Sequence, residues 1–327
     1  MRLLIGFLMV VTLALAGAGY GWLNRPMEMP LAGVDLAVEA GASAKDVAGA
    51  VVRAGVRVQP ALLYGWFRLS GQAKRIRAGS YELDPLTTPR SLLTKLVQGD
   101  EALRSVTLVE GWNFRQVIAA LEKADALRAD AGKLASAELM ARLGKPGVEP
   151  EGRFFPNTYT YAKGSSDIAV LQQAMRAMDQ RLDAVWSARA PESSLQSPEQ
   201  VLILASIIEK ETGVASDRSM VSSVFHNRLR IGMRLQTDPT VIYGLGEAFD
   251  GNLRKRDLVT DTPWNTYTRA GLPPTPIAMP GKASLIAAVQ PAASKALYFV
   301  AKGNGGSHFS ATLDEHNRAV NQYQRGQ

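Results

Sequence analysis

One apolar segment constrains the fold of this chain more than any other. Residues 201–208 read VLILASII, which leaves no polar stripe at helical period. Ser197 precedes Pro198 and lies three residues before Gln200, a pattern typical of a helix start with a capping box, and Gly213 is a typical helix stop. Because a helix that is apolar on all sides must be buried, we expect this one at the centre of a domain.

Two acids near the end of this helix are expected to face different ways. At about 100° per residue, Glu209 lies above the small Ala205 and Ser206, whereas Glu211 lies above bulkier residues such as Leu204. The small residues predict room for a substrate beside Glu209, and the bulky ones predict core packing of Glu211 with a basic partner. A carboxyl among aliphatic side chains resists ionising and can act as a general acid. The alternative is that both acids form structural ion pairs, since acids at a helix C-terminus oppose its dipole.

Composition limits the classes of protein that remain. With 327 residues, 46% of them hydrophobic, the chain can bury a sizeable core, and we expect two domains. Cysteine is absent, which excludes disulfides and thiol chemistry. The net charge of +7 suits a polyanion or an anionic membrane surface, but no basic run is interleaved with aromatics, so we expect no nucleic acid partner. His226, His308 and His316 lack metal-ligand spacing, and we expect neither a metal nor another cofactor.

The N-terminal segment predicts export. Residues 3–24 carry no charge, and the apolar run is long enough to cross a bilayer as a helix. Arg2 and the amino terminus favour a cytoplasmic start, although Arg25 weakens this bias. Residues 14–16, Ala-Leu-Ala, also resemble a cleavage site, so a removed signal peptide is the alternative. We favour an anchor because the apolar run continues past that site to Trp22.

Short strand and helix patterns follow a linker with two prolines at 25–30. Residues 34–38 alternate like a strand, and residues 43–54 have the spacing of a helix with three inward valines, Val47, Val51 and Val52. Residues 40–47 are echoed by residues 110–117, which predicts two small strand–helix units.

A second echo joins residues 79–83 to residues 152–156. Each reads as a strand that enters a turn containing proline, which favours an α+β fold over a doubly wound sheet. The stretch 187–198 is rich in Ala, Ser and Pro and predicts the loop before the buried helix.

Three polar stretches after Glu209 predict a carbohydrate site. They are residues 236–240, 265–267 and 271–276, and they combine amide, hydroxyl and aromatic groups with turn formers. Such groups suit a sugar, whose hydroxyls need hydrogen-bond partners and whose C–H faces stack on rings. Alternatively, Asp238 and Asn265 only cap turns. No phosphate loop or Ser-His-Asp order favours another chemistry.

A series of motifs runs along the chain in a recognisable order. They are EG at 110–111, EG at 151–152, FPNTY at 155–159, ASIIEKET at 205–212, FHNRL at 225–229, LQTDPTVIYG at 235–244, NTY at 265–267 and GLPP at 271–274. Together with the N-terminal apolar segment, this series resembles the YceG-like endolytic murein transglycosylases. The resemblance extends from the anchor to Asn317, although residues 124–148 carry no recognised motif.

The resemblance implies a single-pass inner-membrane protein with a cytoplasmic N-terminus and a periplasmic catalytic part. We expect an anchor at 1–24, a linker at 25–30, a small LysM-like α/β subdomain at 31–105, a connecting α/β region at 106–197 and a mixed α+β catalytic region at 198–327, in which the buried central helix carries the catalytic glutamate. The implied partners are peptidoglycan glycan strands, the membrane and bifunctional penicillin-binding synthases.

The resemblance also implies that Glu209 is the catalytic acid and base. Cleavage would fall on the β-1,4 bond between MurNAc and GlcNAc within nascent strands, leave a 1,6-anhydroMurNAc end and terminate elongation. One carboxyl would suffice, because the C6 hydroxyl of the sugar replaces water as the attacking group. The candidates for holding the strand are Glu211, Gln236, Thr237, Asp238, Tyr243, Asn265 and Tyr267.

Two alternatives stay open on sequence grounds. A hydrolase would pair Glu209 with Asp238 or Glu211 and release a reducing end. A non-catalytic protein would be an anchored scaffold that binds the wall through its LysM-like part.

Overall fold

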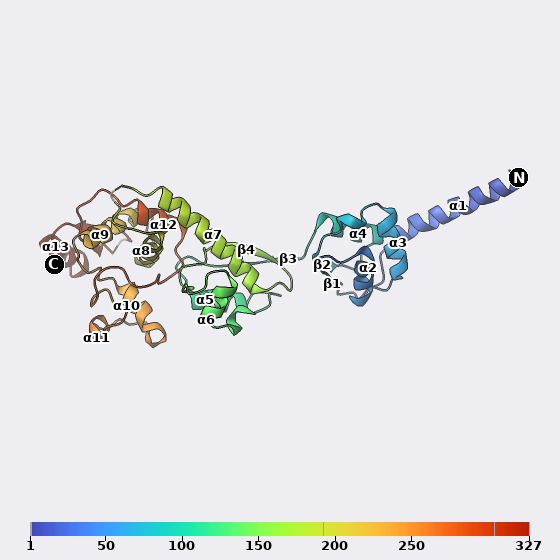
Figure 1. Cartoon of the computed structure of the whole chain (residues 1–327). Helices are drawn as coiled ribbons and strands as arrows, with labels where there is room; N and C mark the ends of the chain where they lie inside the picture. Colours follow the sequence, from blue (N-terminus) through green and yellow to red (C-terminus); the bar gives the residue numbers. More distant parts are fainter. Residues whose placement is uncertain (1, 192, 304, 327) are drawn as a thin grey trace. The chain divides into compact units, whose positions relative to one another are not determined.

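The computed structural model describes residues 2–191, 193–303 and 305–326; the charged amino terminus at Met1 and the end of the predicted catalytic region at Gln327 lie outside these ranges. The chain divides into two compact units (Figure 1). The first unit comprises 1–104 and 161–165, and the second comprises 105–160 and 166–327. The residues predicted as connecting and catalytic regions therefore lie in one unit, apart from 161–165. Helices alternate with two-stranded sheets, which confirms the α+β class.

The N-terminal helix α1 spans Arg2–Leu23. Within it, Ile5–Leu23 is long and apolar enough to cross a membrane, with a mean hydropathy of 1.7 and no residue of its most apolar window buried. At its end Trp22 packs against the core of the first unit. The helix thus fits a single-pass anchor, and a signal sequence would meet the same criteria.

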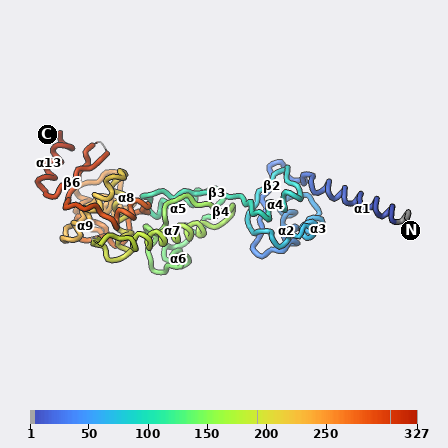
Figure 2. Tube along the Cα trace, turned by 90° about the horizontal axis from the view of Figure 1, so that it is seen from above, coloured from blue at the N-terminus to red at the C-terminus, as the bar shows by residue number. Residues whose placement is uncertain are grey.

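After α1, the first unit contains a two-stranded sheet that packs with α-helices. Strand β1 (Val34–Val38) pairs antiparallel with β2 (Gly79–Leu83), and Leu36 lies opposite Tyr81. The helices α2 (Ala44–Arg53), α3 (Pro60–Leu69) and α4 (Pro89–Gln98) lie together beside the strands (Figure 2). Their buried apolar residues form one core, for example Val47, Leu63, Phe67 and Leu92.

Helix α2 shows which of its features the local sequence predicts correctly. It begins at Ser43, whose side chain accepts the Asp46 N–H while the Asp46 side chain accepts the Ser43 N–H, so this end is fixed by adjacent residues. Val47 and Val51 are buried as predicted, but Val52 is 36% exposed. The prediction for Val52 is wrong because the valine lies about 100° around the helix from Val51, outside the buried stripe.

Strands β3 (Leu103–Thr107) and β4 (Thr158–Ala162) pair, and the boundary between the units falls inside both. The strand predicted at 152–156 is wrong. Gly152 has φ +78°, and a Cβ there would lie 2.6 Å from the Pro276 ring. Pro156 lacks an N–H to donate to a ladder. The chain becomes extended strand only after this turn.

The second unit is mostly helical. Its elements are α5 (Phe114–Glu122), α6 (Ser136–Arg142), α7 (Asp167–Ser187), α8 (Pro198–Glu211), α9 (Arg218–Arg230), α10 (Asp238–Leu245), α11 (Lys255–Val259), α12 (Lys282–Val289), β5 (Tyr298–Ala301), β6 (Ser307–Ser310) and α13 (Leu313–Gln324). The helix α8 lies against α7, α9 and α12 (Figure 1). Two short 3-10 turns, Ala131–Lys133 and Gly246–Ala248, complete this unit, and a third at Ala73–Arg75 belongs to the first.

Helix α8 is buried as its sequence predicts. All residues from 201 to 208 are buried, and burial of each large aliphatic side chain contributes about 1.5–3 kcal/mol. Ser197 accepts the N–H of Gln200, but the Gln200 side chain accepts the N–H of Gln196, so the reciprocal capping box does not form. The helix ends at Glu211, before the predicted stop at Gly213.

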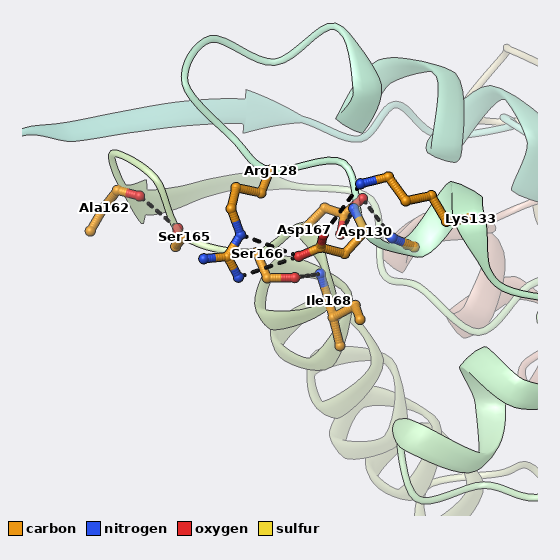
Figure 3. A network of polar contacts seen from close by, with 9 residues as sticks. Arg128, Asp130, Lys133, Ala162, Ser165, Ser166, Asp167 and Ile168 are labelled. Carbon is orange, nitrogen blue, oxygen red and sulfur yellow. Dashed lines mark hydrogen bonds and ion pairs between the residues drawn. The ribbon is translucent and has the colours of Figure 1, made fainter. Parts of the chain in front are cut away.

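The long helix α7 begins at a buried polar network (Figure 3). The Asp167 carboxylate is buried and accepts the N–H groups of Asp130 and Ala131 at 3.1 and 3.0 Å. Ser166 accepts the Ile168 N–H at the N-cap. This network fixes the loop around residue 130, which lies in the region without recognised motifs, to the start of α7.

Candidate active site

Glu209 lies on the last turn of α8 and is half-buried. Its Oε2 accepts the N–H of Gly281 at 2.9 Å. Gly281 is the N-cap residue of α12, so the carboxylate lies near the positive end of that helix. This contact offsets the unfavourable interaction between the Glu209 carboxylate and the negative C-terminal end of α8.

The small residues of α8 below Glu209 do not leave room for a substrate, and that prediction is wrong. Ala205 and Ser206 are fully buried. The Ser206 hydroxyl accepts the N–H of Ile277 at 3.0 Å, so residues 277–281 cover this face. The small side chains leave space for the backbone of residues 277–281. On this face of the helix, Glu209 on the last turn is partly exposed.

Glu110 is a second carboxyl at this site that sequence reasoning missed. Gly111 donates to the Met279 carbonyl at 2.9 Å, and Met279 donates to the Trp112 carbonyl at 2.7 Å. A Cβ on Gly281 would overlap the Glu110 carboxyl. Burial, and then the charge of Glu209, raise the pKa of Glu110 above its usual range. The available signal was the EG motif at 110–111, which the family resemblance included without a role.

A cavity of about 1200 Å³ is lined by Gly111 and Lys210, the neighbours of Glu209, whose Cγ lies 3.8 Å from the Cβ position of Gly111; Glu209 itself is not a lining residue. The Lys210 ammonium donates to the Gly111 carbonyl at 3.3 Å. The walls of the cavity include residues from the start of α5, from α6 and from α10. Tyr243 and Trp264 line it in an edge-to-face pair with ring centroids 5.4 Å apart. Aromatic rings with nearby carboxylates and cations suit a sugar.

Glu151 forms part of the cavity wall and is the second residue that sequence reasoning left without a role. It is 6% exposed, and both oxygens accept the Phe114 N–H at 3.1 Å. Its Oε2 also accepts the Tyr243 hydroxyl at 3.1 Å. Burial raises the pKa of Glu151 to about 7 despite these hydrogen bonds. Glu151 therefore connects α5 to α10 across the cavity.

Glu211 has different surroundings from those predicted. The Thr237 hydroxyl donates to its carboxylate, and no ion pair to Glu211 occurs among the described residues. Arg228 is buried but donates to the carbonyls of Leu297 and Leu235. Burial raises the pKa of Glu211, the Thr237 hydrogen bond lowers it, and Arg228 acts only through its charge. The predicted basic partner is replaced by a hydroxyl.

The other predicted strand-holding residues lie near one another, but around Glu211 and not along the cavity. Tyr267 donates to Asp238 Oδ1 at 2.5 Å, beside Thr237. Gln236 is exposed, with φ +48°. Asn265 is fully buried.

The contacts of Asn265 support the alternative that it holds turns. Its amide donates to the carbonyls of Leu258 and Thr260, and its Oδ1 accepts the N–H of Tyr267 at 2.8 Å. Of the predicted set, only Tyr243 lines the cavity next to Glu209.

The comparisons with known proteins agree with the motifs. The model of the YceG-like family matches residues 36–322. The endolytic murein transglycosylase of Bacillus subtilis is 33% identical over 275 residues, which cover 77% of this chain and 74% of that protein. The endolytic murein transglycosylase of Streptococcus pneumoniae is 24% identical over 325 residues, 88% of this chain and 58% of that protein.

A solved structure shares the fold. The crystal structure of a YceG-like protein from Listeria monocytogenes aligns with a TM-score of 0.55 and 29% identity, covering 87% of this chain and 97% of that chain. The chain belongs to the YceG-like family, and the family resemblance predicted from the motifs is confirmed.

Proposed function

We infer that this chain is a peptidoglycan lytic transglycosylase that cleaves within glycan strands. The observation that carries the assignment of the site is the position of Glu209, which lies half-open at the end of a buried helix and beside a cavity lined with aromatic rings. Family membership and the names of the relatives support the same activity.

The carboxyl of Glu209 serves as acid and then as base. The Gly281 N–H holds Oε2, and within the described chain no hydrogen bond occupies Oε1. Oε1 is therefore the oxygen that meets the sugar. Glu209 protonates the oxygen between MurNAc C1 and GlcNAc, the C1–O bond breaks, and GlcNAc leaves with a hydroxyl.

The second half of the reaction returns the proton. Positive charge develops at C1 and on the ring oxygen. Glu209, now a carboxylate, accepts the proton of the MurNAc C6 hydroxyl, whose oxygen bonds to C1. The product is a 1,6-anhydroMurNAc end, and water takes no part. The intramolecular hydroxyl has a high effective molarity, which favours this route.

The cavity binds the strand on one side of the scissile bond. Its volume of about 1200 Å³ exceeds that of a drug-sized pocket, as a site for several sugar rings requires. Tyr243 and Trp264 stack against sugar C–H faces. The LysM-like part of the first unit gives the chain a further hold on the glycan.

The membrane anchor limits where cleavage occurs. With α1 in the inner membrane and its start in the cytoplasm, the catalytic part lies in the periplasm. Strands emerging from a membrane synthase pass close to such an enzyme, so it cuts nascent glycan and ends elongation. Bifunctional penicillin-binding synthases are the partners that this role requires.

A two-carboxylate hydrolase is the second candidate, and the position of Glu110 favours it. A carboxylate next to Glu209 could activate water or attack C1. Such an enzyme would leave reducing ends, one water heavier than anhydro ends.

The test uses the full chain in detergent on purified murein. Glu209→Gln removes the proton donor and should abolish cleavage with no change in thermal unfolding. The matched control is Glu199→Gln, on the first turn of α8, where the acid pairs with Arg153 at 2.6 Å. Loss of activity in the control alone, or cleavage by Glu209→Gln at the rate of the unaltered chain, would contradict the assignment and favour a wall-binding scaffold.

A further inference from the structure

Gly281 contacts both carboxyls of the site. Its N–H donates to Glu209, and the space that a Cβ would fill is taken by the carboxyl of Glu110, whose Oε2 lies 2.8 Å from that position. The φ of Gly281 is −79°, which any residue adopts. A larger residue at this position would displace the Glu110 carboxyl, although the backbone conformation itself would accept one.

The backbone fixes Glu110 at this place. The reciprocal hydrogen bonds of Gly111 and Trp112 with Met279 hold the two segments side by side. Lys210, next to Glu209, donates to the Gly111 carbonyl and joins α8 to the same segment. Three parts of the chain therefore converge on one pair of carboxyls.

Few charged side chains surround the carboxyls of Glu110 and Glu209. Burial and the charge of Glu209 raise the pKa of Glu110, and the guanidinium of Arg218 on α9 lowers it. Lys210 is the other cation facing this segment, and its ammonium lies 4.0 Å from the Cβ position of Gly111. The two carboxyls both lie against Gly281, and neither forms an ion pair among the described residues, so two negative charges here repel each other.

We propose that Glu110 is a positioning residue for Glu209: both carboxyls lie against Gly281, and the negative charge of Glu110 favours the protonated form of Glu209, so that Glu209 has the proton that it must donate. The inference rests on the proposed function. Glu209 is the residue that donates a proton to the sugar and accepts one from it, and Glu110 acts only through Glu209. Glu110 neither attacks C1 nor activates water.

The decisive measurement is the pH–rate profile of murein cleavage by the full chain in detergent. Glu110→Gln keeps the shape of the side chain and removes its charge. We expect the alkaline limb to move down by about one pH unit, so that kcat falls roughly tenfold at neutral pH and recovers at lower pH. KM should stay constant, because Glu110 does not hold the strand.

A second variant tests the geometry. Gly281→Ala keeps the N–H that serves Glu209 but places a methyl group where the Glu110 carboxyl lies. It should reproduce the shift of the alkaline limb. In a Glu110→Ala background the methyl group has space, and adding Gly281→Ala should cause no further shift.

The matched control is Glu122→Gln. The carboxyl of Glu122 also occupies the Cβ position of a glycine, Gly132, in the same unit, but lies on α5 and not at Gly281. Its pH–rate profile should equal that of the unaltered chain. Thermal unfolding of each variant shows whether it is folded. If Glu110→Gln does not fold, the pH–rate profile of Gly281→Ala tests the proposal instead.

The outcomes separate the two hypotheses. If Glu209→Gln retains cleavage, the proposed function fails. If Glu209→Gln is inactive and Glu110→Gln has an unshifted profile, only the role of Glu110 is overturned. An equal loss of kcat by Glu110→Gln at every pH also overturns it, because that result would make Glu110 a reacting group.

Discussion

The two sides of the last turn of α8 carry the same kind of side chain in different surroundings. Glu209 and Glu211 are both half-buried. Glu209 accepts a backbone N–H and lies near a second carboxyl and near Gly111, which lines the cavity, whereas Glu211 accepts a hydroxyl from Thr237. A spacing of two residues rotates them by about 200° around the helix. In the proposed function, position on the helix, and not residue type, separates the acid that acts on the sugar from the acid that packs.

The largest expected effect is on the Glu209 side. Glu209→Gln should lower kcat by about 10²–10⁴, the usual contribution of a general acid, without lowering the melting temperature. Glu211→Gln should affect thermal unfolding more than kcat. The measurements are murein cleavage rates and melting curves of both variants in detergent. Equal losses of kcat would remove the distinction between the two sides.

The second effect concerns Glu151, which connects α5 to α10. Its pKa rises from 4.5 to about 7 on folding. Between these pH values the native state binds more protons than the unfolded state, so the free energy of unfolding falls as pH rises through this window. The total change is roughly 3 kcal/mol. Glu151→Gln should remove this part of the pH dependence, measured by denaturant titration at pH 4.5 and 7.5.

Glu138→Gln is the control for this titration. Its exposed carboxylate pairs with Arg142 on the surface of α6, and it should leave the pH dependence of unfolding intact. A Glu151→Gln variant with the slope of the unaltered chain would show that the buried carboxyl does not titrate in this range.

The third effect is at Ser206, below Glu209. Ser206→Ala leaves the buried N–H of Ile277 without its acceptor, and the free energy of unfolding should fall by about 1–3 kcal/mol. Because residues 277–281 also carry the N–H that holds Glu209, kcat should fall as well. Denaturant titration and cleavage rates measure the two effects. A fall in stability with unchanged kcat would show that this segment does not position Glu209.

The smallest expected effect is on the Glu211 side. Thr237→Val removes the hydroxyl that Glu211 accepts and should lower the free energy of unfolding by about 1 kcal/mol or slightly more. Thr237→Ser retains the hydroxyl and serves as the control. If Thr237→Val lowers kcat as strongly as Ser206→Ala, the Glu211 side takes part in the site after all.

Local signals in the sequence predicted the elements well. The start of α8 at Ser197, the strands at 34–38 and 79–83, and the burial of 201–208 all depend on residues close to one another in the chain. The strand expected at 152–156 failed because Gly152 has a positive φ and packs closely against Pro276, which lies far along the chain.

The site was less predictable for the same reason. Glu209 could be singled out from helix period and burial, but its neighbours Glu110 and Gly281 reach it only through the pairing of the segment at 110–112 with Met279. The residue pattern within either segment does not predict that contact. The polar loop residues had the right composition for a sugar site, yet Asn265 uses its amide to hold its own turn.

The claim that Glu209 acts with a sugar hydroxyl, and not with water, is tested most directly by the ends of the cleaved strands. Murein is digested by the full chain in water enriched in oxygen-18, and the products are analysed by mass spectrometry. We predict 1,6-anhydroMurNAc ends that carry no heavy oxygen, formed by the unaltered chain and absent with Glu209→Gln. Reducing ends that carry oxygen-18 would contradict this account and would make Glu110 and Glu209 the two carboxylates of a hydrolase.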